Sequence, residues 1–71
     1  MPNYFDPELI QVMRIALEDV MTRVPLEHSN PTVQSYLAEC ILKAAAQGHI
    51  SYSELVAAAA EQIQVAISLF T

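Results

Sequence analysis

The sequence predicts a small all-α protein, a compact three-helix unit, and three observations support this prediction. Three segments repeat apolar residues with the period of an α-helix, each follows a helix-start signal, and no stretch alternates like a strand. A chain of 71 residues has room for one core, so we expect a single domain over 1–71. The helices are predicted at about 7–24, 31–47 and 52–70.

The first helix is predicted from its start signal. Asp6 is a good cap, and Pro7 suits the first helical position, where its missing N–H is not needed. Apolar residues then recur every three or four positions. Pro25 disfavours a helical residue before it, so this helix should end near 24.

The second helix begins with the same device, Asn30 followed by Pro31. Gly48 is typical of the left-handed residue that follows a helix end. The central apolar residues of this helix are Val33, Leu37, Cys40, Ile41 and Ala44.

The third helix has the most specific start. Ser51 and Glu54 have capping-box spacing, in which each side chain satisfies a backbone N–H near the other. Neither proline nor glycine interrupts the following residues, so one helix is predicted through Phe70. Its central apolar residues are Leu55, Ala59, Ile63, Ala66 and Phe70.

The second and third helices carry more apolar surface than one copy can bury. Their apolar residues span roughly 220–240° of the circumference, whereas a helix on a single core needs somewhat over about 100°. Small chains also gain stability from oligomerisation. We therefore expect a homodimer with two-fold symmetry. The predicted interface anchors are Leu42, Val65 and Leu69, with Phe70 and Tyr36 at the margin.

The charge distribution argues against nucleic acids and membranes as partners. The formal net charge is −5, and the chain has only three Lys and Arg residues. Each cation has a carboxylate about one helical turn away, as in Arg14–Glu18, Asp19–Arg23 and Glu39–Lys43. No basic cluster is left to displace counterions from phosphates or to bind anionic lipids.

The polar residues do not form a predicted catalytic, cofactor or metal site, and no small-molecule substrate is expected. His28 and His49 flank the second helix, roughly 25 Å apart at 1.5 Å per residue, and are expected to face solvent. Ser51 is close to His49 but already has a capping role. Cys40 falls within the apolar stripe, where a free cysteine acts as a small hydrophobe. We therefore expect no enzymatic activity.

The predicted location is the cytoplasm. The chain has one cysteine, so it cannot form an internal disulfide, and its first residues lack the basic and apolar regions of a signal peptide. Its longest apolar run is also far shorter than a membrane span.

Residues 41–56 resemble the helix-turn-helix of bacterial regulators, in which a helix ends at glycine and a second helix opens with Ser-x-x-Glu-Leu. The predicted exposed positions of the second helix of this motif are Tyr52, Ser53, Ala57, Glu61 and Gln64. None is a lysine or arginine that could contact phosphate or guanine. The form of this hypothesis that stays open is a helix-turn-helix scaffold that does not read DNA directly.

The whole chain resembles a group of short all-helical proteins of alphaproteobacteria, rhizobia and their relatives, whose function is unknown. The resemblance lies in residues 4–8, 16–18, 37–39 and 41–45, and in Gly48 before the third helix. These residues are helix starts and packing positions. The resemblance implies a bacterial cytoplasmic protein with no catalytic residues to transfer.

Two functions are compatible with these observations. The first is a non-enzymatic module for protein–protein interaction that self-associates. The second is an acidic regulator or inhibitor that docks on a basic macromolecule, using carboxylates such as Glu8, Glu18, Glu54 and Glu61.

Overall fold

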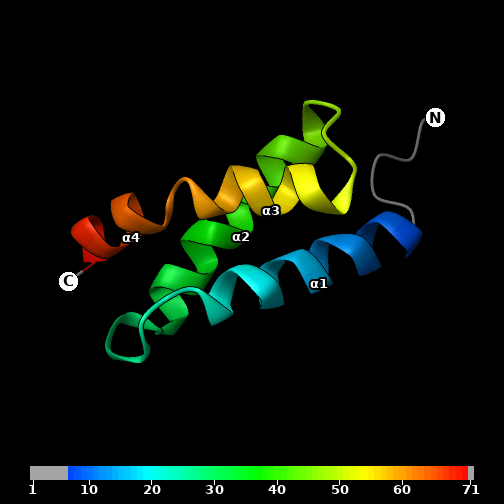
Figure 1. Cartoon of the computed structure of the whole chain (residues 1–71). Helices are drawn as coiled ribbons and strands as arrows, with labels where there is room; N and C mark the ends of the chain where they lie inside the picture. The colour runs from blue at the N-terminus through cyan, green and yellow to red at the C-terminus, as the bar shows by residue number, and fades with distance from the viewer. Residues whose placement is uncertain (1–6, 71) are drawn as a thin grey trace.

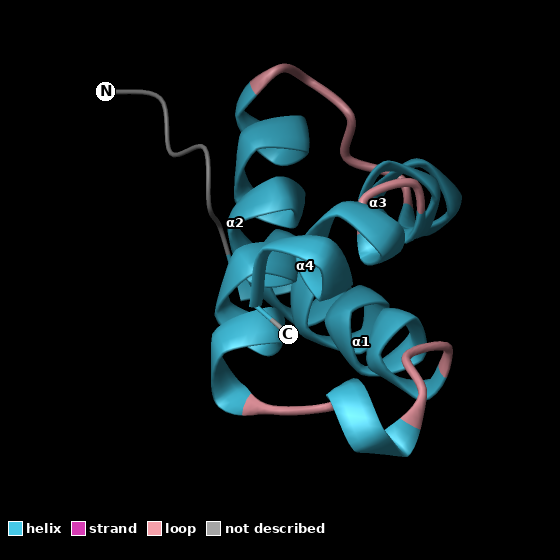
Figure 2. Ribbon diagram, turned by 90° about the vertical axis from the view of Figure 1, so that its left-hand side faces the viewer, coloured by secondary structure: helices cyan, strands magenta, loops and turns pink. Residues whose placement is uncertain are grey.

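The computed structural model describes residues 7–70 of the chain. It contains the α-helices α1 (Pro7–Thr22), α2 (Pro31–Ala46), α3 (Tyr52–Ala60) and α4 (Ile63–Phe70), and a short 3₁₀ turn, η1 (Leu26–His28). These residues contain no strand (Figure 2). The all-α prediction is confirmed. The three predicted helical segments are present, and the third is divided into α3 and α4.

The predicted start signals act as expected where the structure describes them. Asn30 caps α2, because its side-chain oxygen accepts a hydrogen bond of 2.9 Å from the Val33 N–H. Ser51 caps α3 in the same way, accepting from the Glu54 N–H at 3.3 Å. The Ser51 hydroxyl also donates to the Glu54 carboxylate at 2.8 Å. The cap predicted at Asp6 lies outside the described residues.

Two predicted helix ends were slightly too late. The first helix ends at Thr22 rather than 24, because Arg23 and Val24 bond to carbonyls three residues back and tighten the chain before Pro25. The second ends at Ala46. Gly48, at φ +99°, then takes the left-handed conformation that glycine adopts without strain.

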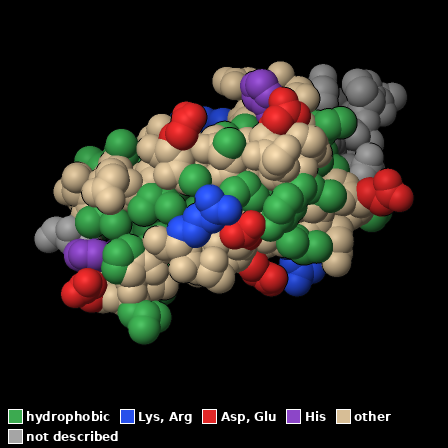
Figure 3. All heavy atoms as spheres, in the orientation of Figure 1, with side chains coloured by type: hydrophobic (Ala, Val, Ile, Leu, Met, Phe, Trp, Pro, Cys, Tyr) green, Lys and Arg blue, Asp and Glu red, His purple; other side chains and the backbone are tan. Residues whose placement is uncertain are grey.

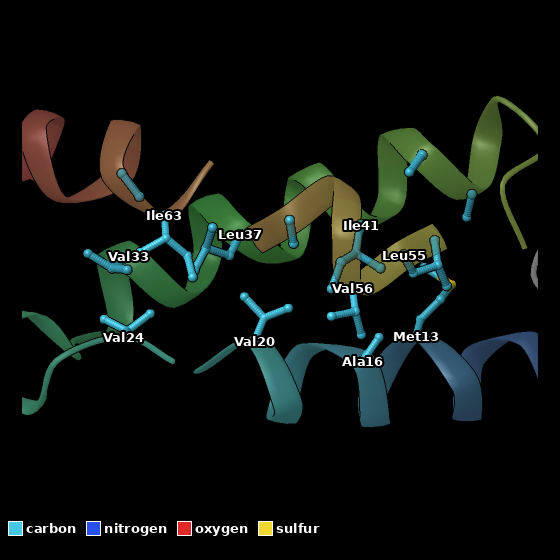
Figure 4. Packing of buried hydrophobic residues seen from close by; sticks show 14 residues of the cluster. Met13, Ala16, Val20, Val24, Val33, Leu37, Ile41, Leu55, Val56 and Ile63 are labelled. Atoms are coloured by element: carbon cyan, nitrogen blue, oxygen red, sulfur yellow. The ribbon is translucent and has the colours of Figure 1, made fainter. Parts of the chain in front are cut away.

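Helices α1, α2 and α3 contact one another pairwise, and α4 packs mainly against α2 (Figure 1). The molecule is elongated, at 40 × 18 × 18 Å. Its core runs along the length of the molecule and receives side chains from all four helices (Figure 4). The largest fully buried side chains are Leu37, Ile41, Leu55, Val20 and Val33. No aromatic ring is fully buried in the described part of the chain, so the core is thin.

The prediction of a single helix over 52–70 was wrong, because the helix is interrupted at residues 61–62. Gln62 bonds to the Ala59 carbonyl three residues back, and a new helical ladder begins when Ala66 bonds to Gln62. Since residues 52–70 contain neither glycine nor proline, no local signal marks this break. We attribute the break to tertiary packing: the chain changes direction so that α4 stays against α2 (Figure 1).

No helix in the described residues combines the length and hydropathy that crossing a bilayer requires.

Candidate interaction surfaces

The three predicted interface anchors are exposed. The exposed fractions are 45% for Leu42, 42% for Val65 and 60% for Leu69. If one copy of the chain covered its own apolar residues, these three would lie beneath neighbouring side chains. Within residues 7–70 they do not, so their apolar surface is open to another molecule.

The anchors do not share one surface. Leu42 belongs to a groove between α1 and α2. Val65 and Leu69 lie on α4, on average about a third of a turn around the helix from the buried Ile63 and Ala66. The structure therefore divides the predicted interface into a groove at α1 and α2 and an apolar strip on α4.

Tyr36 and Phe70 are brought together by the fold. Their ring centroids are 5.8 Å apart, and the rings meet edge to face at 65°, a favoured aromatic geometry. The Tyr36 hydroxyl also donates to the Gln62 side chain at 3.3 Å, beside the break between α3 and α4. Both residues, predicted at the margin of an interface, thus hold α4 against α2.

The groove between α1 and α2, here called the α1–α2 groove, is almost wholly apolar. Its volume is about 300 Å³. The lining residues are Ile10, Met13, Arg14, Leu17, Ala38, Ile41 and Leu42. Arg14 is the one charged residue among them, and Ile10 and Leu42, on opposite walls, are 44% and 45% exposed.

Sequence reasoning missed Ile10 and Leu17 as parts of this surface. Their spacing is that of one helix face, which predicts burial as well as it predicts a groove. Only the placement of α2 beside them shows that Ile10 stays exposed next to Leu42.

Charged side chains are dispersed over the surface. On the face seen in Figure 3, hydrophobic side chains form a broad band, and the basic side chains are separated from one another. Of the three predicted ion pairs, only Asp19–Arg23 forms in residues 7–70, at 3.3 Å. The pairs predicted for Arg14 and Lys43 do not form. The attraction within an exposed ion pair is weak, and forming the pair restricts two flexible side chains.

A second groove, between α2 and α3, is lined by both polar and apolar side chains. Its volume is about 520 Å³, and its lining includes Cys40, Lys43, His49 and Glu54. Cys40 is half-buried. Burial raises the pKa of its thiol, and the nearby Lys43 only partly opposes this effect. A raised pKa leaves less of the nucleophilic thiolate at neutral pH.

His49 is engaged at the start of α3. Its Nδ1 lies 3.1 Å from a Glu54 carboxylate oxygen. The hydrogen bonds from His49 and then Ser51 hold the pKa of Glu54 below its ordinary value. The Glu54 carboxylate is thus held by hydrogen bonds at the start of α3.

The expectation that both histidines face solvent was wrong for His28. This residue is half-buried in η1, and its Nδ1 is shielded without a hydrogen-bond partner among the described residues. The 3₁₀ turn, which the sequence pattern did not predict, accounts for this placement. No group of three or more His, Cys, Asp and Glu side chains is placed to hold a metal ion within residues 7–70.

The α2–α3 corner differs from a typical helix-turn-helix. Residues 47–51 separate the two helices, against a turn of about three to four residues in that motif. The five positions predicted to be exposed on the second helix of the motif are all exposed. They are Tyr52, Ser53, Ala57, Glu61 and Gln64. They carry no positive charge.

A hydrogen bond connects α1 and α3 at the surface, from the Tyr52 hydroxyl to the Asp19 carboxylate. This bond, followed by the smaller effect of Arg23, lowers the pKa of Asp19. The same bond raises the pKa of Tyr52. Because the ionised form of Asp19 is favoured in the folded state, its contribution to stability is present above the unfolded pKa and is lost as pH falls through the folded value.

Replacing Tyr52 by phenylalanine should therefore raise the pKa of Asp19 toward its ordinary value of 3.8. The Asp19 side-chain carbon resonance, followed by NMR during an acid titration, measures the shift. Tyr36→Phe is the matched control, since that hydroxyl bonds to Gln62 and not to a carboxylate. An Asp19 titration unchanged by Tyr52→Phe would contradict this assignment.

The fold and the exposed apolar residues together describe a small all-α protein with open surfaces. No known protein family, curated protein or solved structure matches the chain. The resemblance to the alphaproteobacterial group stays a prediction.

Proposed function

We propose that this chain is a non-enzymatic interaction module that self-associates as a two-fold dimer through apolar side chains that its own fold leaves exposed. The observation that carries the proposal is the exposure of Leu42, Val65 and Leu69, at 42–60% each. Apolar surface in water is unfavourable in proportion to its area, so covering these side chains with another copy stabilises both chains.

The thin core supports the proposal. Its largest fully buried side chains are leucine, isoleucine and valine, and the chain contains no disulfide. A protein of this size gains little stability from such a core alone, and oligomerisation is a common supplement.

The acidic docking function has less support in the structure. A surface that docks on a basic partner needs carboxylates without partners of their own. Glu54 is bonded to His49 and Ser51, and Asp19 to Tyr52 and Arg23. Two of the seven acidic residues in the described range 7–70 are thus already engaged within the fold.

Sedimentation equilibrium at micromolar concentration tests the proposal. We expect a mass near twice the 7.8 kDa of one chain. The dimer should persist at about 1 M salt, where the Debye length falls to about 3 Å and electrostatic attraction is screened. A single species of 7.8 kDa, in dilute buffer as well as at about 1 M salt, would overturn the proposed self-association.

A further inference from the structure

We propose that the second copy docks on the α1–α2 groove, with Leu42 of each chain entering the groove of the other. This inference rests on the proposed self-association and identifies which of the two exposed apolar surfaces makes the contact. The competing surface is the strip on α4 formed by Val65 and Leu69.

The shapes of the two surfaces favour the groove. It is a hollow of about 300 Å³ between two helices of 16 residues each, and apolar side chains line both walls. On α4, an outer helix of eight residues, Val65 and Leu69 are exposed beside Phe70, which is 41% exposed and packs against Tyr36. A concave apolar site buries more of an inserted side chain than a convex one does, and buried side chains in such pockets dominate interface energies.

Two-fold symmetry fits the arrangement of the groove. In a two-fold contact the same patch meets itself, so it needs both a projecting side chain and a hollow. Leu42 projects from the α2 wall at 45% exposure, and the hollow lies between it and Ile10 on α1. The same patch therefore provides both the projecting side chain and the hollow that a two-fold contact needs.

Charge complementarity favours the same face. Two copies of net charge −5 repel each other, and cations at their contact lessen this repulsion. Arg14 lines the groove and makes no ion pair with any described residue, including Glu18 one turn away. Glu18 and Glu39 are exposed on α1 and α2. A two-fold contact can therefore pair Arg14 of each chain with a carboxylate of the other. Residues 52–70 offer no Lys or Arg for such a pair.

The test makes the same kind of substitution, an exposed apolar residue to glutamate, once on each of the two surfaces. Leu42→Glu should raise the dissociation constant of the dimer at least about 30-fold, as expected for an interface anchor. Val65→Glu, at a site of nearly equal exposure, should change it less than about threefold. Sedimentation equilibrium measures both, and circular dichroism with a thermal melt shows that each variant is folded.

Arg14→Glu adds an electrostatic test on the same face. It should weaken the dimer, and its difference from the wild type should shrink at about 1 M salt, since exposed charges are then screened. Ile10→Glu repeats the apolar test on α1, so the conclusion does not depend on the folding of one variant.

The outcomes separate the two proposals. A wild-type chain that is monomeric overturns self-association and the groove contact together. A wild-type dimer that survives both Leu42→Glu and Ile10→Glu overturns the groove contact and leaves self-association standing. Dissociation by Val65→Glu, alone or together with Leu42→Glu, also overturns the groove contact, since it places α4 in the interface.

Discussion

Replacing Leu37 by alanine is expected to lower the free energy of unfolding by about 2–5 kcal/mol. Leu37 is fully buried in the middle of α2, where it lies close to Val33 and Ile63 (Figure 4). Truncation removes its apolar burial and leaves a cavity that a thin core can only partly fill. A 71-residue domain has roughly 4–11 kcal/mol of stability in total, so this single change should remove a large share of it and lower the midpoint of thermal unfolding.

Urea unfolding followed by helical circular dichroism, at one fixed protein concentration, measures the loss. Leu26→Ala is the matched control, because Leu26 is 93% exposed. The control should change the stability by less than about 0.5 kcal/mol. Equal effects of the two substitutions would show that α2 does not pack as described.

Replacing Ala59 by leucine should destabilise the protein by about 1–3 kcal/mol through overpacking. Ala59 is fully buried on the face of α3 that packs against α1 and α2. Ala16 on α1 and Ala66 on α4 are likewise fully buried. These small side chains let the helices approach closely, and a larger residue forces them apart.

Ala57→Leu provides the control on the same helix. Ala57 is exposed, and both substitutions replace alanine by a residue of similar helix propensity, so they differ mainly in packing. Thermal unfolding should show a clearly lower midpoint for Ala59→Leu only. A stabilised Ala59→Leu variant would mean that the structure has unfilled space at this position.

The fold class and most helix boundaries could be predicted from sequence because they depend on local chemistry. Asn30 and Ser51 cap the helices they were expected to cap, and Gly48 takes the left-handed conformation after α2. Each of these signals acts within a few residues of chain, so no tertiary information is needed to recognise it.

The break at residues 61–62 and the 3₁₀ turn at Leu26–His28 could not be predicted in the same way. No glycine or proline marks the break, and a continuous helix over 52–70 satisfies every local preference. We attribute the place of the bend to packing on α2, where Tyr36 contacts both Gln62 and Phe70.

The sequence by itself determined which residues are apolar beyond the needs of one core, and Leu42, Val65 and Leu69 are indeed exposed. Helical periodicity places each residue around its own helix axis, and this is why the surplus could be counted. Periodicity does not say which helix lies beside which. Only the tertiary structure paired Leu42 with Ile10 across a groove and turned Tyr36 and Phe70 toward each other. Such neighbours are distant along the chain, and packing alone brings them together.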